Sequence, residues 1–200
     1  MTIYDLKPAF QNLLRPVTRG LYRAGVTANQ VTLAALLLSA ATGAWLAWRA
    51  ESSQALLAMP VVLFVRMALN AIDGMLAREH NQKSRLGAIL NELGDILSDS
   101  ALYLPLALHQ GFNGGLVAIA VLLAVSSEMT GVLGLTVGAS RRYDGPMGKS
   151  DRAFVFGAVS LALGLGVKPG LWINIVMGAT AALLGLTIWN RARRALKEAG

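Results

Sequence analysis

The sequence predicts an all-α membrane protein with six transmembrane helices and an N-terminal amphipathic helix at the membrane interface. The 200-residue chain is 54% hydrophobic and 14% charged, whereas soluble domains carry about a quarter charged residues. Its apolar runs approach the roughly 20 residues that cross a bilayer as a helix. Its basic residues fall on alternate connectors, which is typical of multi-pass membrane proteins.

Residues 1–25 have the pattern of an amphipathic helix and lack the apolar core and cleavage site of a signal peptide. Basic amphipathic helices of this kind lie at the membrane interface against anionic lipid. An ordinary surface helix is the alternative. The apolar residues at helical spacing are Ile3, Leu6, Phe10, Leu13, Leu14, Val17 and Leu21.

Six apolar runs follow and fill residues 29–191, before a basic tail over residues 192–200. The connectors are too short to hold a soluble domain, so we interpret residues 1–200 as one integral-membrane domain. The chain has no cysteine, which excludes disulfides and thiol chemistry. The predicted spans are 29–49, 54–78, 86–109, 113–139, 152–167 and 170–191, of which the fifth is the shortest.

The net charge of +7 indicates membrane topology and lipid contact, not nucleic-acid binding. Fifteen of the 18 Lys and Arg residues fall on one side of the six-span arrangement, and only Arg49 and Lys168 fall on the other. Because basic segments stay in the cytoplasm, we expect both termini to face the cytoplasm from a bacterial inner membrane. The fifteen are Lys7, Arg15, Arg19, Arg23, Arg78, Lys83, Arg85, Arg141, Arg142, Lys149, Arg152, Arg191, Arg193, Arg194 and Lys197.

Two polar stripes run along the second and third spans. An ionised group near the bilayer centre costs about 3 kcal/mol, so such groups persist where they pair or function. At about 100° per residue, each stripe occupies one helix face, and we expect the two to meet in a cleft open to the cytoplasm. The stripes are Arg66, Asn70, Asp73, Gly74 and Ala77 on the second span and Gly87, Asn91, Glu92, Asp95 and Asp99 on the third.

Clustered carboxylates repel one another unless a proton or a cation lies between them. Carboxylate and amide oxygens, together with substrate phosphate, suit Mg²⁺ or Mn²⁺. We therefore expect a functional role for Asp73 and Asp95. Structural ion pairing is the alternative for the others, with Arg66 as the shared partner of Glu92, Asp99 and, from the fourth span, Glu128.

Residues 70–95 resemble the signature of the CDP-alcohol phosphotransferase family, D-x-x-D-G-x-x-A-R-x(8)-G-x-x-x-D-x-x-x-D. The chain has N-A-I-D-G-M-L-A-R, then eight residues, then G-A-I-L-N-E-L-G-D. Six of the eight fixed positions match. The segment V-T-A-N-Q-V-T, which opens the first span, and the six spans also resemble this family, particularly its phosphatidylglycerophosphate synthases.

The resemblance implies transfer of a phosphatidyl group from CDP-diacylglycerol to an alcohol, with release of CMP, in phospholipid biosynthesis. It implies Mg²⁺ or Mn²⁺ at the diphosphate, an active site facing the cytoplasm, and a homodimer. Asp95 and Asp73 would be catalytic, with Asp95 as the base. The implied metal ligands are Asp73, Asp95, Asn70 and Asn91, and the implied nucleotide-binding residues are Asn29, Thr32, Gly74, Ala77, Arg78 and Gly87.

Asn70 and Asn91 depart from the signature, which has aspartate at both positions. Asparagine offers a carbonyl oxygen but no negative charge, so we expect fewer or weaker metal ions than is usual for the family. Two alternatives stay open. One is a catalytically silent relative that binds CDP-lipid, and the other is a small transporter or channel.

The connector over residues 140–154, S-R-R-Y-D-G-P-M-G-K-S-D-R-A-F, contains a second group of basic residues. Lysine binds phosphate through a single ammonium charge, and arginine binds it through a planar guanidinium that offers two donors. We expect Lys149, Arg152 and Arg141 to bind the acceptor, which suggests a phosphorylated polyol such as glycerol 3-phosphate. The alternative is that these charges only keep the connector in the cytoplasm.

Overall fold

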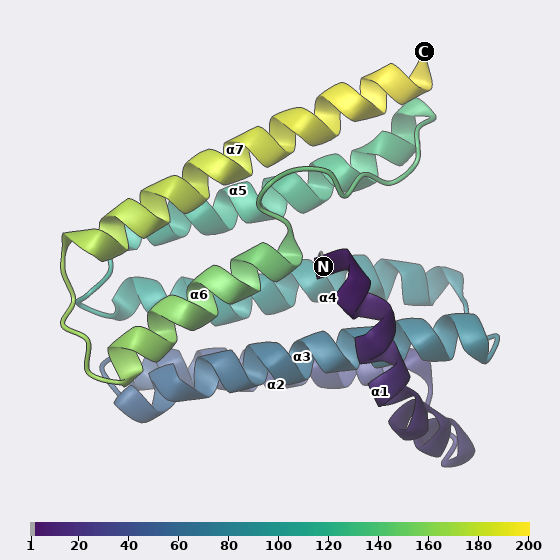
Figure 1. Cartoon of the computed structure of the whole chain (residues 1–200), viewed down its shortest axis with the longest axis horizontal. Helices are drawn as coiled ribbons and strands as arrows, with labels where there is room; N and C mark the ends of the chain where they lie inside the picture. The colour runs from purple at the N-terminus through teal and green to yellow at the C-terminus, as the bar shows by residue number, and fades with distance from the viewer. Residues whose placement is uncertain (1–2) are drawn as a thin grey trace.

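The computed structural model describes residues 3–200, with side chains from residue 8 onward, and this part of the chain is helical with no strand (Figure 1). Residues 1–2 of the predicted interfacial helix and the side chains of Ile3, Leu6 and Lys7 lie outside that description. The elements are α1 (Ile3–Arg23), α2 (Ala28–Trp48), α3 (Ser53–Glu79), α4 (Arg85–Tyr103), η1 (Leu104–Leu108), α5 (Gly114–Leu133), η2 (Gly134–Val137), α6 (Lys149–Gly164) and α7 (Leu171–Ala199).

Each predicted span coincides with one of the helices α2 to α7. Four of these helices are long and apolar enough to cross a membrane: α2, α3, α5 together with η2, and α7. The helix α6 has only 16 residues, and α4 carries three carboxylates within its 19 residues. The structure therefore supports a polytopic membrane protein, and crossing by α4 and α6 stays a prediction.

The third and fourth predicted spans each end in a short 3₁₀ helix, η1 and η2 respectively. Pro105 lies at the start of η1, which carries the chain from α4 in a 3₁₀ turn. Proline has no backbone N–H to donate, and its ring clashes with the preceding turn, so it disfavours continuation of the α-helix. At the end of the fourth span, η2 stops at Gly138, whose φ of +87° is accessible to glycine at little cost.

The helices form two groups (Figure 1). In one, α2 packs against both α3 and α4, and α6 packs against α3. In the other, α5 and α7 run side by side in the same direction, and this pair contacts the first group mainly through α4 and η1. The carboxyl end of α3, the amino end of α4 and the carboxyl end of α7 all lie at one end of the molecule.

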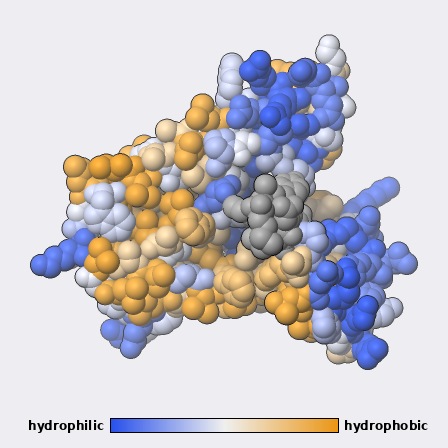
Figure 2. All heavy atoms as spheres, viewed as in Figure 1, coloured by the Kyte–Doolittle hydropathy of each residue, from blue (hydrophilic) through white to orange (hydrophobic). Residues whose placement is uncertain are grey.

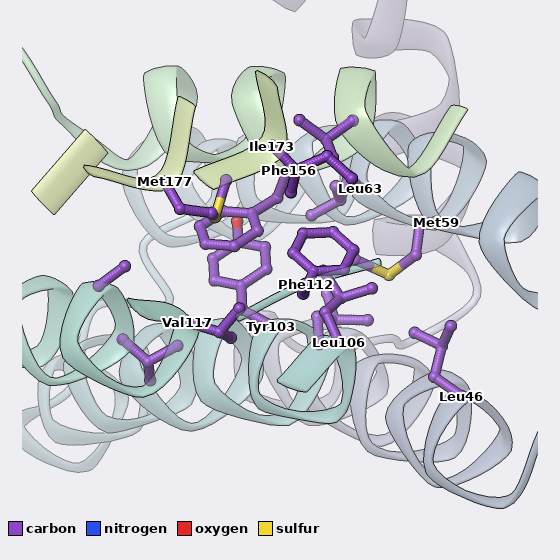
Figure 3. Close-up of a cluster of buried hydrophobic side chains, with 14 of the residues drawn as sticks. Leu46, Met59, Leu63, Tyr103, Leu106, Phe112, Val117, Phe156, Ile173 and Met177 are labelled. Carbon is purple, nitrogen blue, oxygen red and sulfur yellow. The ribbon is translucent and has the colours of Figure 1, made fainter. Parts of the chain in front are cut away.

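A single large cluster of apolar side chains joins the two groups (Figure 3). The rings of Tyr103 and Phe156 stack at its centre, with centroids 4.1 Å apart. Ile173 and Met177 of α7 cover them, and both are fully buried. Aromatic stacking adds to the burial of apolar area, so this cluster fixes α4, α6 and α7 relative to one another.

The helix α1 crosses α3 near the carboxyl end of α3 (Figure 1). Arg15 pairs with Glu79 at 3.0 Å, and the ring of Tyr22 stacks on that of His80. Leu14 and Leu21 pack toward the bundle. Other apolar residues of α1, including Leu13 and Val17, remain exposed, and the position of α1 at the membrane interface stays a prediction.

The polar surface is distributed unevenly along the molecule. In Figure 2, hydrophilic residues gather at the end where α7 terminates and where α3 is followed by α4, and apolar residues predominate over the rest of this face. The elements that meet at this end carry basic residues such as Arg78, Lys83, Arg85, Arg194 and Lys197, and the orientation in the membrane stays a prediction.

Replacing Gly43 tests the close packing of α2 against α4. A Cβ atom at Gly43 would overlap the backbone carbonyl of Ala101, which cannot move without displacing α4. We expect Gly43→Ala to lower the free energy of unfolding by about 1–3 kcal/mol, measured by denaturation in detergent micelles. Gly178→Ala on α7 is the matched control, because its Cβ would meet nothing within 4 Å. Equal stability of the two variants would contradict this packing.

Candidate active site

The polar stripes of α3 and α4 meet in antiparallel order. Arg66 donates from Nη1 to Asp99 Oδ1 at 2.5 Å and from Nη2 to the backbone oxygen of Asp95 at 3.1 Å. One turn further along α3, Asn70 Nδ2 lies 3.3 Å from Asp95 Oδ1 and donates to it. The four-residue steps of the two helices thus match, and polar side chains bridge α3 to α4.

Asp73 is buried, and α2 holds its carboxylate. The Thr32 hydroxyl donates to Asp73 Oδ2 at 2.8 Å. Thr32 lies in the first turns of α2, which begins with a capping box in which Thr27 and Gln30 satisfy each other's backbone N–H groups. Ala28 N also donates to Gln82 Oε1, at 2.7 Å. The amino end of α2 is therefore fixed against the carboxyl end of α3.

Asp95 faces the amino end of α6. Lys149 is the first residue of that helix, and its ammonium group forms an ion pair with Asp95 Oδ1. Arg66 Nη2 lies 3.6 Å from the same oxygen. Asp95 thus has two cationic neighbours and one amide donor, supplied by α3 and α6.

Small residues surround the carboxylates at the predicted nucleotide side. A Cβ atom at Gly74 would lie 3.0 Å from Arg78 Nη1, so the Arg78 guanidinium folds over this glycine. A Cβ atom at Gly87 would lie 2.8 Å from Asn29 Oδ1. Ala77 packs against a small cluster formed by α2 and α3. The structure therefore brings Asn29, Thr32, Gly74, Ala77, Arg78 and Gly87 to the same end of α2, α3 and α4 as Asp73.

The donor set limits how many metal ions this site can hold. Within the described residues, no group of three or more His, Cys, Asp or Glu side chains is placed to hold a metal. Two carboxylates, Asp73 and Asp95, and two amides, Asn70 and Asn91, remain. Oxygen donors of this kind fit one hard divalent cation completed by water and phosphate oxygens. A second dication would have to share these two carboxylates and would depend on the negative charge of a bound diphosphate.

One turn deeper in the bundle, buried charges join α3, α4, α5, α6 and α7. Arg152 donates to Asp99 Oδ2 at 2.8 Å and to Glu128 Oε1 at 3.1 Å. Arg191 lies 3.4 Å from Glu128 Oε1. Because Asp99 also binds Arg66, each carboxylate in this network has two or more arginine partners, and the network ties both groups of helices together.

The pairing differs from the one that the sequence suggested. Arg66 pairs with Asp99, but Glu92 and Glu128 do not reach it. Arg141 binds Glu92 through two bonds of 2.5 and 2.6 Å, and it also contacts Glu128 at 3.1 Å. The connector folds back over α4 and α5, so its arginines reach these carboxylates first. That return path could not be read from the apolar pattern.

The connector between η2 and α6 is anchored to both α5 and α7. Arg142 N donates to the Gly131 carbonyl, and Met147 N donates to Thr187 Oγ1, both at 3.0 Å. Arg142 and Arg194 also bind Asp144. Burial alone would raise the pKa of Asp144, but these two hydrogen bonds lower the pKa below its ordinary value. These contacts fix the position of the connector backbone that leads to Lys149.

The sequence analysis did not single out Arg191 or Gln82. Arg191 was counted only among the fifteen basic residues of the cytoplasmic side, yet it is buried, and it donates to the backbone oxygens of Ser127 and Asp144 as well as contacting Glu128. A signal was present, because Arg191 follows the buried residues Leu184 and Thr187 at helical spacing on α7. Gln82 lies in a connector, where no periodic pattern identifies a capping partner.

Replacing Arg152 tests whether the buried network stabilises the bundle. Arg152→Met leaves Asp99 and Glu128 without their shared arginine, and breaking a buried pair costs about 3–5 kcal/mol. We expect a loss of this size in the free energy of unfolding in detergent. Arg194→Met is the control, because the Arg194 side chain is 63% exposed and such pairs contribute about 0–1 kcal/mol. The network has no structural role if both variants unfold alike.

Comparisons with known proteins identify relatives that are similar in sequence over most of the chain. The family model described as CDP-alcohol phosphatidyltransferase matches residues 25–189. A protein of Escherichia coli named Inner membrane protein YnbA is 49% identical over 196 residues, which cover 98% of this chain and 97% of that one. The phosphatidylinositol phosphate synthase of Mycobacterium tuberculosis is 25% identical over 203 residues, covering 92% and 89% of the two chains.

Two solved structures of phosphatidylinositol phosphate synthase from Mycobacterium tuberculosis share the fold. The structure with CDP-DAG bound aligns with a TM-score of 0.78 and 22% identity, covering 92% of this chain and 94% of that chain. The structure in complex with manganese and citrate aligns with the same TM-score and identity and covers 92% and 90%.

Proposed function

Because the chain belongs to the CDP-alcohol phosphatidyltransferase family, we propose that it transfers a phosphatidyl group from CDP-diacylglycerol to an alcohol and releases CMP. The observation that carries this proposal is the position of the two signature carboxylates, Asp73 on α3 and Asp95 on α4, each held by a side chain of another helix. Thr32 orients Asp73, and Asn70 and Lys149 orient Asp95. A structural neighbour with CDP-DAG bound supports the choice of donor.

In the proposed reaction, Asp95 accepts the proton of the acceptor hydroxyl. The hydroxyl oxygen forms a bond to the phosphorus that carries the diacylglycerol. The bond between that phosphorus and the bridging oxygen of the diphosphate breaks, and CMP leaves with the electron pair. Lys149 provides positive charge beside the attacking group, where negative charge develops on the phosphate oxygens.

A divalent cation, Mg²⁺ or Mn²⁺, would neutralise the diphosphate when bound. Asp73 and Asp95 would hold it, with amide oxygens from Asn70 and Asn91. A structural neighbour in complex with manganese supports this proposal. The same four residues would also bring the nucleotide close to the amino end of α4, beside Arg78 and Gly87.

For the acceptor we propose a phosphorylated polyol such as glycerol 3-phosphate. Lys149 is the best placed of the three predicted acceptor residues, because its side chain is 30% exposed beside Asp95. Arg152 is 1% exposed and is held by Asp99 and Glu128. Arg141 is held by Glu92. These two arginines would act at a distance, because their charges raise the positive electrostatic potential around Lys149.

We propose that the whole chain is one membrane domain in the bacterial inner membrane, with six crossings and α1 at the cytoplasmic interface. The name of the 49% identical relative supports this membrane, and the distribution of Lys and Arg supports the orientation. In this arrangement the site opens to the cytoplasm, where a soluble acceptor meets a lipid donor. A homodimer is proposed from the family alone.

A catalytically silent relative that binds CDP-lipid is the second candidate function. The observation that favours it is the pair Asn70 and Asn91, because an amide contributes no negative charge to a metal site. Such a protein would bind CDP-diacylglycerol and release no CMP.

The test is CMP release by purified protein in liposomes with CDP-diacylglycerol, Mg²⁺ or Mn²⁺, and a panel of alcohols that includes glycerol 3-phosphate. We expect release that requires both a metal ion and one acceptor. Asp95→Asn removes the base, so we expect release to fall by roughly 10²–10⁴-fold. Glu51→Gln is the control, because Glu51 lies in the connector at the opposite end of α3.

Binding of CDP-diacylglycerol is measured on the same preparations. Binding without CMP release for any acceptor would favour the silent relative over the transferase. Equal release by the wild type and Asp95→Asn would remove Asp95 from the reaction, whichever alcohol proves to be the acceptor.

A further inference from the structure

We propose that Lys149 takes the place of a second metal ion, so that this site binds one divalent cation and supplies the remaining positive charge from its own chain. The proposal rests on the proposed function for the identity of the site. It concerns how Asp95 is neutralised, which the family match leaves open.

The first step is the scarcity of acidic donors. Asp73 and Asp95 are the two carboxylates at the signature positions, and no group of three or more His, Cys, Asp or Glu side chains that could hold a metal ion occurs in the part of the chain that the structure describes. Glu92 cannot join them without leaving Arg141, which binds both of its oxygens. Asp99 is likewise held on both oxygens, by Arg66 and Arg152.

The second step is the position of the Lys149 ammonium group. It forms an ion pair with Asp95 Oδ1, the oxygen that also accepts from Asn70 Nδ2. Arg66 lies 3.6 Å from that oxygen. A dication placed on Oδ1 would meet the ammonium group at close range and be repelled by it. Lysine and metal therefore compete for one oxygen of Asp95, and the other oxygen remains for a cation shared with Asp73.

The third step is the rigidity of the backbone that carries Lys149. Asp151 Oδ2 accepts from Gly148 N at 2.9 Å, which caps the first turn of α6. Met147 N is bonded to Thr187 of α7. Arg152, one turn along, is locked to Asp99 and Glu128. These contacts fix the backbone on both sides of Lys149, so its side chain is directed towards Asp95.

The fourth step is the sum of charge around a bound diphosphate. Two dications bring four positive charges, but Asp73 and Asp95 carry only two negative charges between them. The diphosphate of the donor adds two negative charges, so two dications alone would balance this set, and Lys149 would then be an unbalanced fifth positive charge. One dication with Lys149 brings three positive charges against the same four negative charges. The asparagines at positions 70 and 91 fit this arrangement, because a lone dication needs oxygen ligands more than it needs further charge.

The experiment counts bound manganese without turnover. Purified protein in detergent is dialysed against MnCl₂, and free Mn²⁺ is read by electron paramagnetic resonance. We expect about one Mn²⁺ per chain for the wild type. Lys149→Met removes the competing ammonium group, so we expect Mn²⁺ to bind at least about tenfold more tightly. Lys149→Arg keeps the positive charge and should leave the affinity near that of the wild type.

Lys197→Met is the matched control, because it removes one lysine from the same end of the molecule at the far end of α7. We expect no change in Mn²⁺ binding. A triple variant, Asn70→Asp, Asn91→Asp and Lys149→Met, restores two carboxylates and removes the ammonium group. We expect this variant to bind a second Mn²⁺. Gel filtration of every variant establishes that it remains folded.

Two Mn²⁺ in the wild type, or none, would overturn the proposal, as would equal affinities for the wild type and Lys149→Met. The count of Mn²⁺ is independent of CMP release. If Mn²⁺ binding follows Lys149 but no alcohol supports CMP release, the transfer reaction fails and the one-cation site stands. If CMP is released but Lys149 has no effect on Mn²⁺, the transfer reaction stands and the one-cation site fails.

Discussion

The rest of the structure depends on the buried carboxylate of Asp99. It lies between two arginines, Arg66 of α3 and Arg152 of α6, with donor distances of 2.5 and 2.8 Å. A charge this deep in an apolar bundle is tolerated only with such partners. By binding both arginines, Asp99 fixes the depth of α4 relative to α3 and α6. That depth determines where Asp95, one turn nearer the surface, presents its carboxylate.

The fold was largely predictable because its helices are apolar runs separated by polar connectors. Even the weakest of these runs, over residues 152–167, corresponds to α6. The boundaries that differ are set by local chemistry, such as Pro105 ending α4 in a 3₁₀ turn. Whether α4 crosses the membrane cannot be read from apolarity, because the carboxylates that define its polar face also reduce its hydrophobic character.

The site was predictable where the residues lie on one helix face and unpredictable where a connector returns to it. The meeting of Asn70 with Asp95 follows from four-residue steps on two antiparallel helices that polar side chains bridge. The pairing of Glu92 with Arg141 does not, because the path of residues 138–148 is set by bonds to α5 and α7. Arg191 was missed for the same reason, since its partners come from other parts of the chain. The sequence predicts that Lys149 binds the acceptor, and the structure shows that Lys149 also forms an ion pair with Asp95.

The order of these partners along the chain has a consequence for biosynthesis. Asp99 is made with α4, and Glu128 with α5, but Arg152 arrives only with α6 and Arg191 only with α7. Asp99 has Arg66 of α3 from the start, but every arginine partner of Glu128 is made later, and a buried carboxylate without a counterion is costly. The ion pairs of Glu128 therefore form only after the connector, α6 and α7 have been made. The buried network is thus complete only when the last helix, α7, supplies Arg191.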